Sequence, residues 1–213
     1  MPTIKIQNQT FIPNPCGALF WKEKEMLLVA DVHFGKVSHF RKHGSAVPQK
    51  AIAQNFKQLD KTIASFQPKV ICFLGDLFHS ALNKEWNLFE AWVQYHSALK
   101  IVLIVGNHDI ISPLKYKELG VHIIKEWIID SLLFTHHPEE REGHFNLCGH
   151  IHPGILLSGV GRQKLRLPCF FKSKFQLILP AFGTFTGTYI LEPEEEDEVY
   201  VLGNEEVLLV PNP

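Results

Sequence analysis

Five short apolar segments of this chain are each followed, directly or after one glycine, by a side chain that can bind a metal ion. The segments span residues 26–30, 70–74, 101–105, 132–135 and 145–148. Apolar runs of four to eight residues that end at turn residues are typical of buried β-strands. The polar residues that follow them are Asp31, Asp76, Asn107, His136 and His150. We therefore expect strands whose ends gather polar side chains at one edge of a sheet.

Helical segments separate the first three of these strands. Apolar residues recur with helical spacing from Ile52 to Phe66, and residues 85–99 carry two apolar rows, which predicts a well-buried helix. This alternation predicts a parallel α/β layer. The second half of the chain instead predicts short strands at 127–129, 165–171, 175–179, 188–191, 199–202 and 207–210. The expected fold is α/β and a single domain, residues 1–213: two packed mixed β-sheets flanked by helices, a four-layer α-β-β-α sandwich.

The composition indicates a soluble globular protein without a strong net charge. Hydrophobic residues make up 46% and charged residues 20% of the 213 residues, and the formal net charge is −1. The chain shows no apolar stretch long enough for a signal peptide or a membrane span, so we expect a cytoplasmic protein with no membrane association. The 12 histidines are the unusual number, because histidine is both a common metal ligand and a common proton donor.

The candidate metal ligands are Asp31, His33, Asp76, Asn107, His136, His150 and His152. Burying two aspartates among histidines is costly unless a cation compensates their charge. Seven ligands are too many for one ion and suit two ions that share a carboxylate. Mixed oxygen and imidazole ligands favour manganese, iron or zinc. On an extended backbone, Asp31 and His33 would point to one side, as would His150 and His152.

These motifs resemble the signature of the calcineurin-like metallophosphoesterases. They are D-x-H at 31–33, GD at 75–76, GNHD at 106–109, a histidine at 136 and GHxH at 149–152. The flanking segments ADVHFGKVSHFRKHGSAVP (30–48), LGDLFHS (74–80) and LPAFGTFTG (179–187) resemble the bacterial ligase-associated DNA damage response phosphoesterases. That smaller family is encoded beside a DNA ligase and a helicase, and its members are described as manganese-dependent endonucleases.

The resemblance implies a metallophosphoesterase fold and two divalent metal ions, expected to be manganese with zinc or iron as alternatives. The first ion would be held by Asp31, His33 and His152. The second would be held by Asn107, His136 and His150. Asp76 would bridge the two ions. His137 directly follows His136, and we favour His136 as the ligand because it comes first after the strand.

The resemblance also assigns catalytic candidates. His108 in GNHD would be the general acid that protonates the leaving oxygen. Asp109 would either orient His108 or close the turn. His79 lies three residues after Asp76, as in double-strand-break repair nucleases, and would contact substrate or assist His108. The alternative role for His79 is a structural hydrogen bond to the backbone.

Two basic segments are candidate contacts for a phosphate backbone. The first follows the D-x-H motif and contains Lys36, His39, Arg41, Lys42 and His43, of which Lys36 and Arg41 are the candidate substrate-binding residues. The second contains Arg162, Lys164, Arg166, Lys172 and Lys174. Both segments could equally be solvated surface, and strand alternation could turn the second away from the site.

Three functions are compatible with these observations. The first is a binuclear metal-dependent phosphodiesterase, a DNA endonuclease linked to repair, which would act on single-stranded or damaged DNA and could associate with the ligase or helicase. The second is a small-molecule phosphohydrolase, either a cyclic-nucleotide phosphodiesterase or a phosphomonoesterase with the same site. The third is an interaction module that has the fold without catalysis. The complete ligand set and His108 argue against the third.

Overall fold

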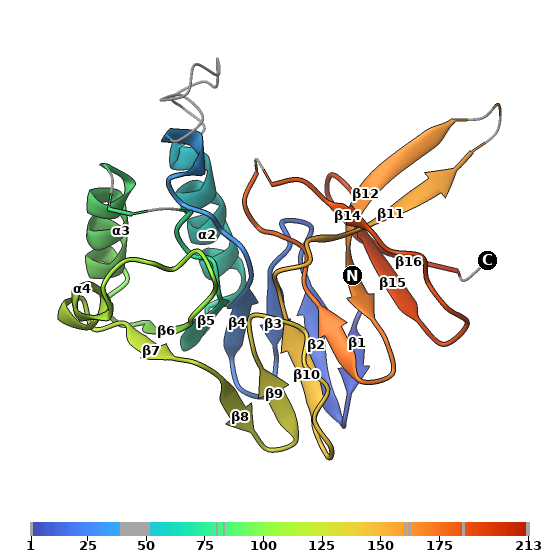
Figure 1. Ribbon diagram of the computed structural model, residues 1–213, viewed down its shortest axis with the longest axis horizontal. Helices are drawn as coiled ribbons and strands as arrows, with labels where there is room; N and C mark the ends of the chain where they lie inside the picture. The colour runs from blue at the N-terminus through green and yellow to red at the C-terminus, as the bar shows by residue number, and fades with distance from the viewer. Residues whose placement is uncertain are drawn as a thin grey trace.

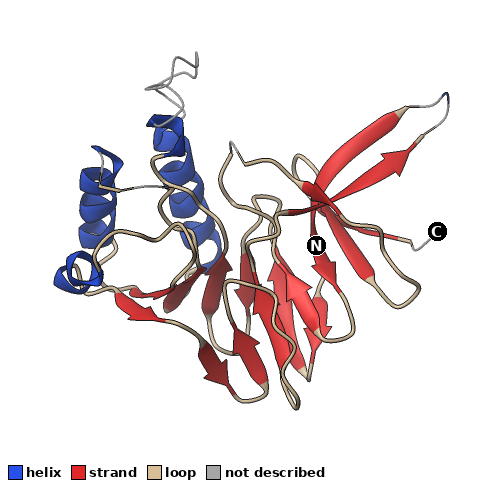
Figure 2. Ribbon diagram, in the orientation of Figure 1, coloured by secondary structure: helices blue, strands red, loops and turns tan. Residues whose placement is uncertain are grey.

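A computed structural model describes residues 2–38, 52–79, 81–82, 84–159, 161, 163–184 and 186–211. Within this part of the chain, two β-sheets pack against each other and helices cover one of them (Figures 1 and 2). The first sheet has the order β1-β2-β3-β4-β5-β6-β7. Its strands are β1 (Ile4–Ile6), β2 (Gln9–Pro13), β3 (Leu19–Trp21), β4 (Met26–Val29), β5 (Val70–Leu74), β6 (Lys100–Ile104) and β7 (His122–Ile124).

The second sheet has the order β14-β11-β12-β13-β10-β9-β8, and β15 pairs with both β12 and β16. Its strands are β8 (Trp127–Ile129), β9 (Leu132–Phe134), β10 (Phe145–Cys148), β11 (Pro153–Ser158), β12 (Lys164–Lys172), β13 (Gln176–Ile178), β14 (Tyr189–Ile190), β15 (Glu198–Leu202) and β16 (Val207–Val210). The helices are α2 (Ile52–Phe66), α3 (Lys84–Tyr95) and α4 (Pro113–Glu118).

The two faces of the first sheet are buried against different partners, because side chains alternate along each strand. Leu28 of β4 packs between the sheets, in a cluster that includes Leu147 of β10. Leu27 of β4 packs on the opposite face, in a cluster that includes Phe56 of α2 and Phe89 of α3. The central strands β4, β5 and β6 are therefore apolar on both faces, which explains why their sequences lack polar alternation.

The carboxyl ends of the parallel strands position the candidate site. Strands β4, β5 and β6 are parallel to one another in the first sheet, as are β9 and β10 in the second. The loops after these strands interlock through backbone hydrogen bonds: the N–H of Asp31 donates to Gly75 at 3.2 Å, and the N–H of Gly149 donates to His136 at 3.0 Å. The two packed sheets thus bring their ligand-bearing loops to one edge.

The fold class is confirmed, with a difference in the fourth layer. Two mixed sheets pack together as expected, but the described residues after Glu118 contain no α-helix, so no helix covers the outer face of the second sheet. The outer face of the second sheet instead carries a third cluster of buried apolar side chains, which includes Ile155 of β11 and Val201 of β15. No helix in the described ranges is both long enough and apolar enough to cross a lipid bilayer.

The expectation that residues 85–99 form a helix buried on more than one side is correct only in part, because Trp92 of the second apolar row is buried and its other residues in the helix are not. Helix α3 ends at Tyr95, and its second apolar row contains Leu88, 45% exposed, and Tyr95, 81% exposed. The side chains of the other apolar row are buried, namely Trp86, Phe89 and Val93. The helix therefore has one buried face and partly apolar residues on its surface.

Candidate metal centre

The carboxylate of Asp76 lies between two groups of candidate ligands. Its Oδ2 atom is 4.0 Å from Nε2 of His33, and its Oδ1 atom is 3.5 Å from Nε2 of His136. The Asp76 side chain is 3% exposed. A carboxylate with one oxygen directed toward each group has the geometry required to bridge two cations.

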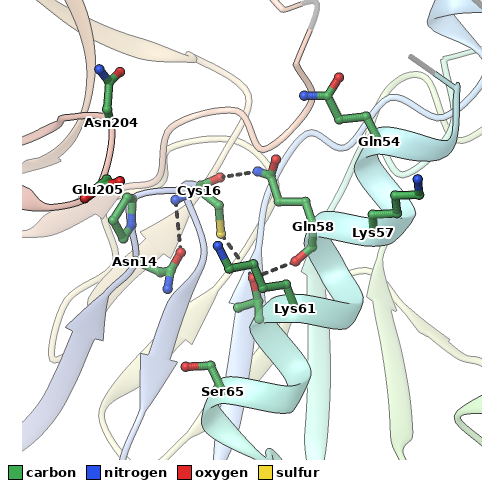
Figure 3. A pocket seen from close by; sticks show the side chains of 11 residues that line it. Asn14, Cys16, Gln54, Lys57, Gln58, Lys61, Ser65, Asn204 and Glu205 are labelled. Atoms are coloured by element: carbon green, nitrogen blue, oxygen red, sulfur yellow. Dashed lines mark hydrogen bonds between the residues drawn. The ribbon is translucent and has the colours of Figure 1, made fainter. Parts of the chain in front are cut away.

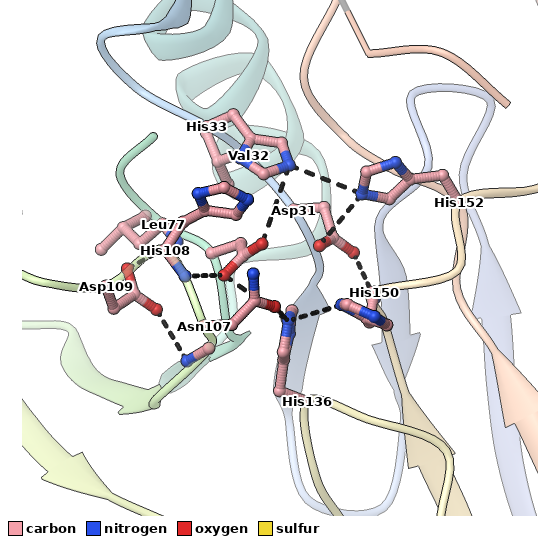
Figure 4. Close-up of polar contacts among 12 residues, drawn as sticks. Asp31, Val32, His33, Leu77, Asn107, His108, Asp109, His136, His150 and His152 are labelled. Carbon is pink, nitrogen blue, oxygen red and sulfur yellow. Dashed lines mark hydrogen bonds and ion pairs between the residues drawn. The ribbon is translucent and has the colours of Figure 1, made fainter. Parts of the chain in front are cut away.

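The first group consists of Asp31, His33 and His152. Nε2 of His152 is 3.2 Å from Oδ1 of Asp31 and 3.5 Å from Nε2 of His33 (Figure 4). Burial lowers the pKa of His33 to about 2, and the positive charge of Lys36 acts in the same direction. His33 is therefore a neutral imidazole, which is the form that binds a metal ion.

The second group lies on the other side of Asp76 and is centred on His136. Nε2 of His136 is 3.0 Å from Oδ1 of Asn107 and 3.2 Å from Nδ1 of His150. Nδ1 of His136 is 2.9 Å from the carbonyl oxygen of Leu74, so an N–H at that position can donate to the backbone and leave Nε2 available. His136 is buried, as expected for the ligand favoured from sequence.

His137 lies closer to the site than the sequence indicated. Its exposed ring is 4.0 Å from the ring of His150, centroid to centroid, and His136, His137 and His150 form a third possible ligand group. Sequence reasoning treated His136 and His137 as alternatives pointing in opposite directions. Side chains do not alternate strictly in the turn after β9. Recognising that turn in the sequence would have allowed His136 and His137 both to be placed near His150.

The ligands do not lie on extended backbone. Asp31, His33, Asp76, His150 and His152 all have positive φ angles, between 51° and 68°. Asp and His tolerate this left-handed conformation better than most residues with a side chain. The expectation that alternation directs His150 and His152 to one side is therefore wrong: His150 lies beside His136, whereas His152 lies beside His33.

Glycines before two of the ligands make room for the carboxylates. A Cβ atom on Gly106 would lie 2.3 Å from Oδ1 of Asp76, and one on Gly149 would lie 2.5 Å from Oδ2 of Asp31. Asp76 also accepts a hydrogen bond from the backbone N–H of His108, two residues after Gly106. Asp31 accepts one from the backbone N–H of His150, directly after Gly149. The GN and GH motifs therefore fix the carboxylates as well as supply ligands.

The residues present fit divalent metal ions. Three overlapping groups of His and Asp side chains are close enough to hold an ion, because within each group one ligand atom per residue lies within 4.8 Å of the others. The groups are Asp31 with His33 and His152, Asp31 with Asp76 and His136, and His136 with His137 and His150. Within the described residues, Oδ1 of Asp31 and Nδ1 of His33 are buried and have no hydrogen-bond partner. Oδ1 of Asp31 has only the His152 imidazole beside it, at 3.2 Å and without a hydrogen bond, and a buried carboxylate oxygen in that position suits a compensating cation.

The candidate catalytic histidines form a cluster beside the first group. The ring centroid of His108 is 5.6 Å from that of His33 and 5.2 Å from that of His79, whose ring is stacked at 29°. His79 donates its backbone N–H to Phe34 at 2.8 Å. His79 and His108 therefore lie side by side at the edge of the metal centre.

Asp109 closes a turn. Its Oδ1 atom accepts hydrogen bonds from the backbone N–H groups of Leu77 and Phe78, and its Oδ2 atom accepts one from Gly106. Burial raises the pKa of the Asp109 carboxyl group, and these hydrogen bonds oppose that effect. Of the two roles left open from sequence, the contacts of its side chain match closure of the turn.

Lys36 is the candidate substrate contact that the described residues include. It is half-buried and lines a small pocket with His33, Gly183 and Thr186. Burial lowers its pKa, whereas the charges of Asp31 and Asp76 raise it. The other candidate, Arg41, lies outside the described residues, as do His39, Lys42, His43 and Arg162.

Glu85 is a positioning residue that sequence reasoning missed. Its buried carboxylate accepts hydrogen bonds from the backbone N–H of Gly35 at 2.6 Å and from the hydroxyl of Ser38 at 2.7 Å. These contacts attach the segment that carries Lys36 to the start of α3. An acidic residue in the first turn of a helix was the available signal, but it also has an ordinary electrostatic explanation.

The second basic segment separates into two parts. Lys172 forms an ion pair with Glu198, and Lys174 lies over the ring of Phe175, so neither reaches the metal ligands. Lys164 and Arg166 are exposed on the β11–β12 hairpin.

A larger groove of about 660 Å³ lies away from the ligands (Figure 3). It is lined by one face of α2, including Lys57 and Lys61, and by the turns that contain Cys16 and Asn204. Hydrogen bonds from Gln58 to the Cys16 carbonyl and between Cys16 and Thr62 hold its floor. None of the predicted metal ligands or catalytic residues lines it, so size alone does not identify the reactive site.

Comparison with known proteins connects this geometry to a family. The model of the calcineurin-like phosphoesterase family matches residues 25–179. The crystal structure of the nuclease MPE from Pseudomonas putida is similar, with 30% sequence identity and a TM-score of 0.83, covering 97% of this chain and 99% of that chain. The phosphoesterase Yfce from E. coli matches at 12% identity and a TM-score of 0.44, covering 88% of this chain and 99% of that one. The search of curated protein sequences gave no match.

The family match covers every predicted metal ligand and both candidate catalytic histidines. Together with the clustered His and Asp side chains, it identifies a metal-dependent phosphoesterase. The chain belongs to the calcineurin-like phosphoesterase family.

Proposed function

We propose that this phosphoesterase is a binuclear phosphodiesterase that cleaves DNA as an endonuclease. The observation that carries the proposal is the carboxylate of Asp76, with one oxygen toward His33 and the other toward His136. Two ligand groups joined by a carboxylate suit the in-line displacement of a phosphodiester. Similarity over 97% of the chain to a protein described as a nuclease supports a nucleic-acid substrate.

The chain itself supplies the groups that hold and orient the reactants. Bound divalent ions would activate water and neutralise charge on the phosphate oxygens. Asp31, His33 and His152 would hold one ion, Asn107, His136 and His150 the other, and Asp76 both. The His108 imidazole would donate a proton to the leaving oxygen of the sugar, an alkoxide that leaves poorly without one.

The loop that carries His108 is fixed from two directions. The backbone N–H of His108 donates to Oδ1 of Asp76 at 2.8 Å. The carboxylate of the next residue, Asp109, accepts hydrogen bonds from the backbone N–H groups of Leu77 and Phe78. The backbone of the proposed proton donor is thereby tied to the Asp76 carboxylate. Such preorganisation reduces the entropic cost of the reactive arrangement.

Several finer assignments belong to the same proposal. Mixed imidazole and oxygen ligands suit manganese, iron or zinc, and the resemblance to the ligase-associated phosphoesterases makes manganese the expected metal. The expected substrate is single-stranded or damaged DNA in the cytoplasm, and the expected role is in DNA repair. Direct association with a DNA ligase or helicase is a further expectation from the resemblance of the segments at 30–48, 74–80 and 179–187.

The test is a comparison of substrates with the manganese-loaded protein. Bis-(p-nitrophenyl) phosphate, 2′,3′-cyclic nucleotides and circular single-stranded DNA would be assayed in parallel. We expect linearisation of the circular DNA, and we expect a His108→Ala variant to lose about 10²–10⁴-fold of this activity while it retains metal and most aryl-ester hydrolysis. Intact DNA together with rapid hydrolysis of cyclic nucleotides would show that the enzyme is a small-molecule phosphohydrolase instead.

A further inference from the structure

The β11–β12 hairpin leaves the body of the protein directly after the ligand His152. Five residue pairs join the two strands, from Gly154 with Pro168 to Ser158 with Lys164. Strand β14 pairs with only the first two residues of β11, and β15 pairs with β12 only from Cys169 onward. Within the described residues, the outer part of the hairpin is therefore a two-stranded arm that projects from the second sheet (Figure 1).

One face of this arm is basic. Leu156 pairs with Arg166, and Ser158 pairs with Lys164, and directly paired residues of antiparallel strands lie on the same face. Lys164 and Arg166 are both exposed, and neither forms an ion pair with any described residue. The opposite face carries the pair of Leu157 and Leu165.

The basic face lies on the side of the first sheet. Lys164, Arg166 and Phe170 occupy alternate positions of β12, so they share one face of the strand. Phe170 packs between the two sheets, whereas Cys169 and Phe171 pack on the outer face of the second sheet. The side chains of Lys164 and Arg166 therefore lie on the face of the arm that continues the inner face of the second sheet. The loops that carry the candidate ligands meet on that side.

The base of this face lies close to Thr188, in the segment that follows β13 and contacts the backbone of Asp31. Gly154 shares the face of Leu156, and a Cβ atom on Gly154 would lie 2.9 Å from Cβ of Thr188. The same segment binds Asp31 through the backbone N–H of Gly183, at 3.2 Å from the Asp31 carbonyl oxygen. Gly183 also lines the pocket that contains Lys36. Gly183 and Thr186 at the Lys36 pocket and Thr188 at the base of the arm thus connect the two regions along the chain.

We infer that this basic face is a docking surface for a single strand of DNA, whose phosphates lie along Arg166 and Lys164 while one phosphodiester occupies the metal centre. The inference rests on the proposed function and specifies how a polymer is held. Cations that contact phosphates position the strand without reading its sequence. Small phosphodiesters do not extend to the arm, so the arm would favour a polymer over them.

The test variant is Lys164→Gln/Arg166→Gln. The matched control is Lys22→Gln/Lys100→Gln, which makes the same change in charge near the amino ends of β4 and β6, at the edge opposite the ligands. Equilibrium binding of a fluorescein-labelled oligothymidylate would be measured by anisotropy across a salt series. Cleavage of circular single-stranded DNA and of bis-(p-nitrophenyl) phosphate would be measured on the same preparations.

We expect the test variant to bind the oligonucleotide on the order of tenfold more weakly at physiological salt, and the slope of log affinity against log salt to fall by about 1.4. DNA cleavage should fall in proportion while aryl-ester hydrolysis stays at the wild-type rate, and the control should change neither. Binding equal to wild type, or an equal loss of activity on both substrates, overturns the inference. Hairpin-dependent binding without turnover of any phosphodiester by the wild type contradicts the proposed function and supports the docking surface.

Discussion

The carboxylate of Asp109 accepts a hydrogen bond from the backbone N–H of Leu77, with the nitrogen 2.9 Å from Oδ1. The same side chain accepts hydrogen bonds from Phe78 and Gly106. One residue therefore joins the loop after β5, which carries Asp76, to the loop after β6, which carries Asn107 and His108. The relative position of the proposed bridging ligand and the proposed proton donor depends on this junction.

Replacing Asp109 with alanine should destabilise the metal-free protein by on the order of 2 kcal/mol, because buried backbone donors lose their acceptor. Asp109→Asn keeps an acceptor oxygen and should lose less. Urea denaturation measures the difference, with Glu118→Ala as a control that removes only an exposed ion pair with Lys115. A changed pH–rate profile in Asp109→Asn at unchanged stability would instead favour a role in orienting His108.

Removal of the His79 side chain should lower the rate of DNA cleavage by about tenfold, because the free energy of one hydrogen bond to a charged group corresponds to a rate change of about that size. The reason is its stacked position beside His108 at the edge of the ligands. His79→Phe keeps a ring of similar shape and should not restore activity. Full recovery of kcat in His79→Phe would show that the ring serves packing alone.

A methyl group on Gly106 should disable the centre without unfolding the chain. Its Cβ would lie 2.3 Å from Oδ1 and 2.4 Å from the backbone nitrogen of Asp76, so both the carboxylate and the loop that carries it must move. Gly106→Ala is expected to reduce metal content and phosphodiester hydrolysis by at least tenfold, the usual cost of displacing a supporting group of a metal ligand. Gly187→Ala is the control, since a Cβ there meets nothing within 4 Å. Equal effects of the two substitutions would refute the close-approach argument.

Metal content should distinguish His136 from His137. His136 is buried, and its Nε2 faces both Asp76 and Asn107, so His136→Ala should weaken binding of one ion by at least 10–100-fold. His137 is exposed and lies beside the rings of His136 and His150 without approaching Asp76 or Asn107 in any described contact, so His137→Ala should retain nearly full metal content. Elemental analysis after gel filtration measures both variants. Loss of metal in His137→Ala alone would reverse the assignment.

The sequence predicted β4, β5, β6 and the strands of the second sheet other than β11, and it missed β1, β2, β3, β7 and β11. Residues 70–74 and 145–148 coincide with β5 and β10, because continuous apolar runs between turn residues have few alternative structures. Strands β1 and β3 have three residues each, too few to show a period. Strand β11 begins with Pro153 and Gly154, which are turn residues by local preference, and exists because β12 supplies its hydrogen bonds.

The candidate site was predictable as a set of residues but not as a set of directions. The order of the motifs brought Asp31, Asp76 and His136 together, and the structure places them in one group. The backbone conformation was not predictable, since alternation applies only inside strands and these ligands follow strand ends. Contacts between distant segments, such as those of Glu85 with Gly35 and Ser38, have no local signature in the sequence.

The positive φ angles of Asp31, His33, Asp76, His150 and His152 have a consequence for engineering. Part of the ligand geometry is held in the main chain, in a conformation that most side chains disfavour. Placing the same five side chains on regular strands of another α/β protein would leave them pointing in other directions. A transplanted centre would need the loops themselves, together with the glycines and the Asp109 junction that hold them.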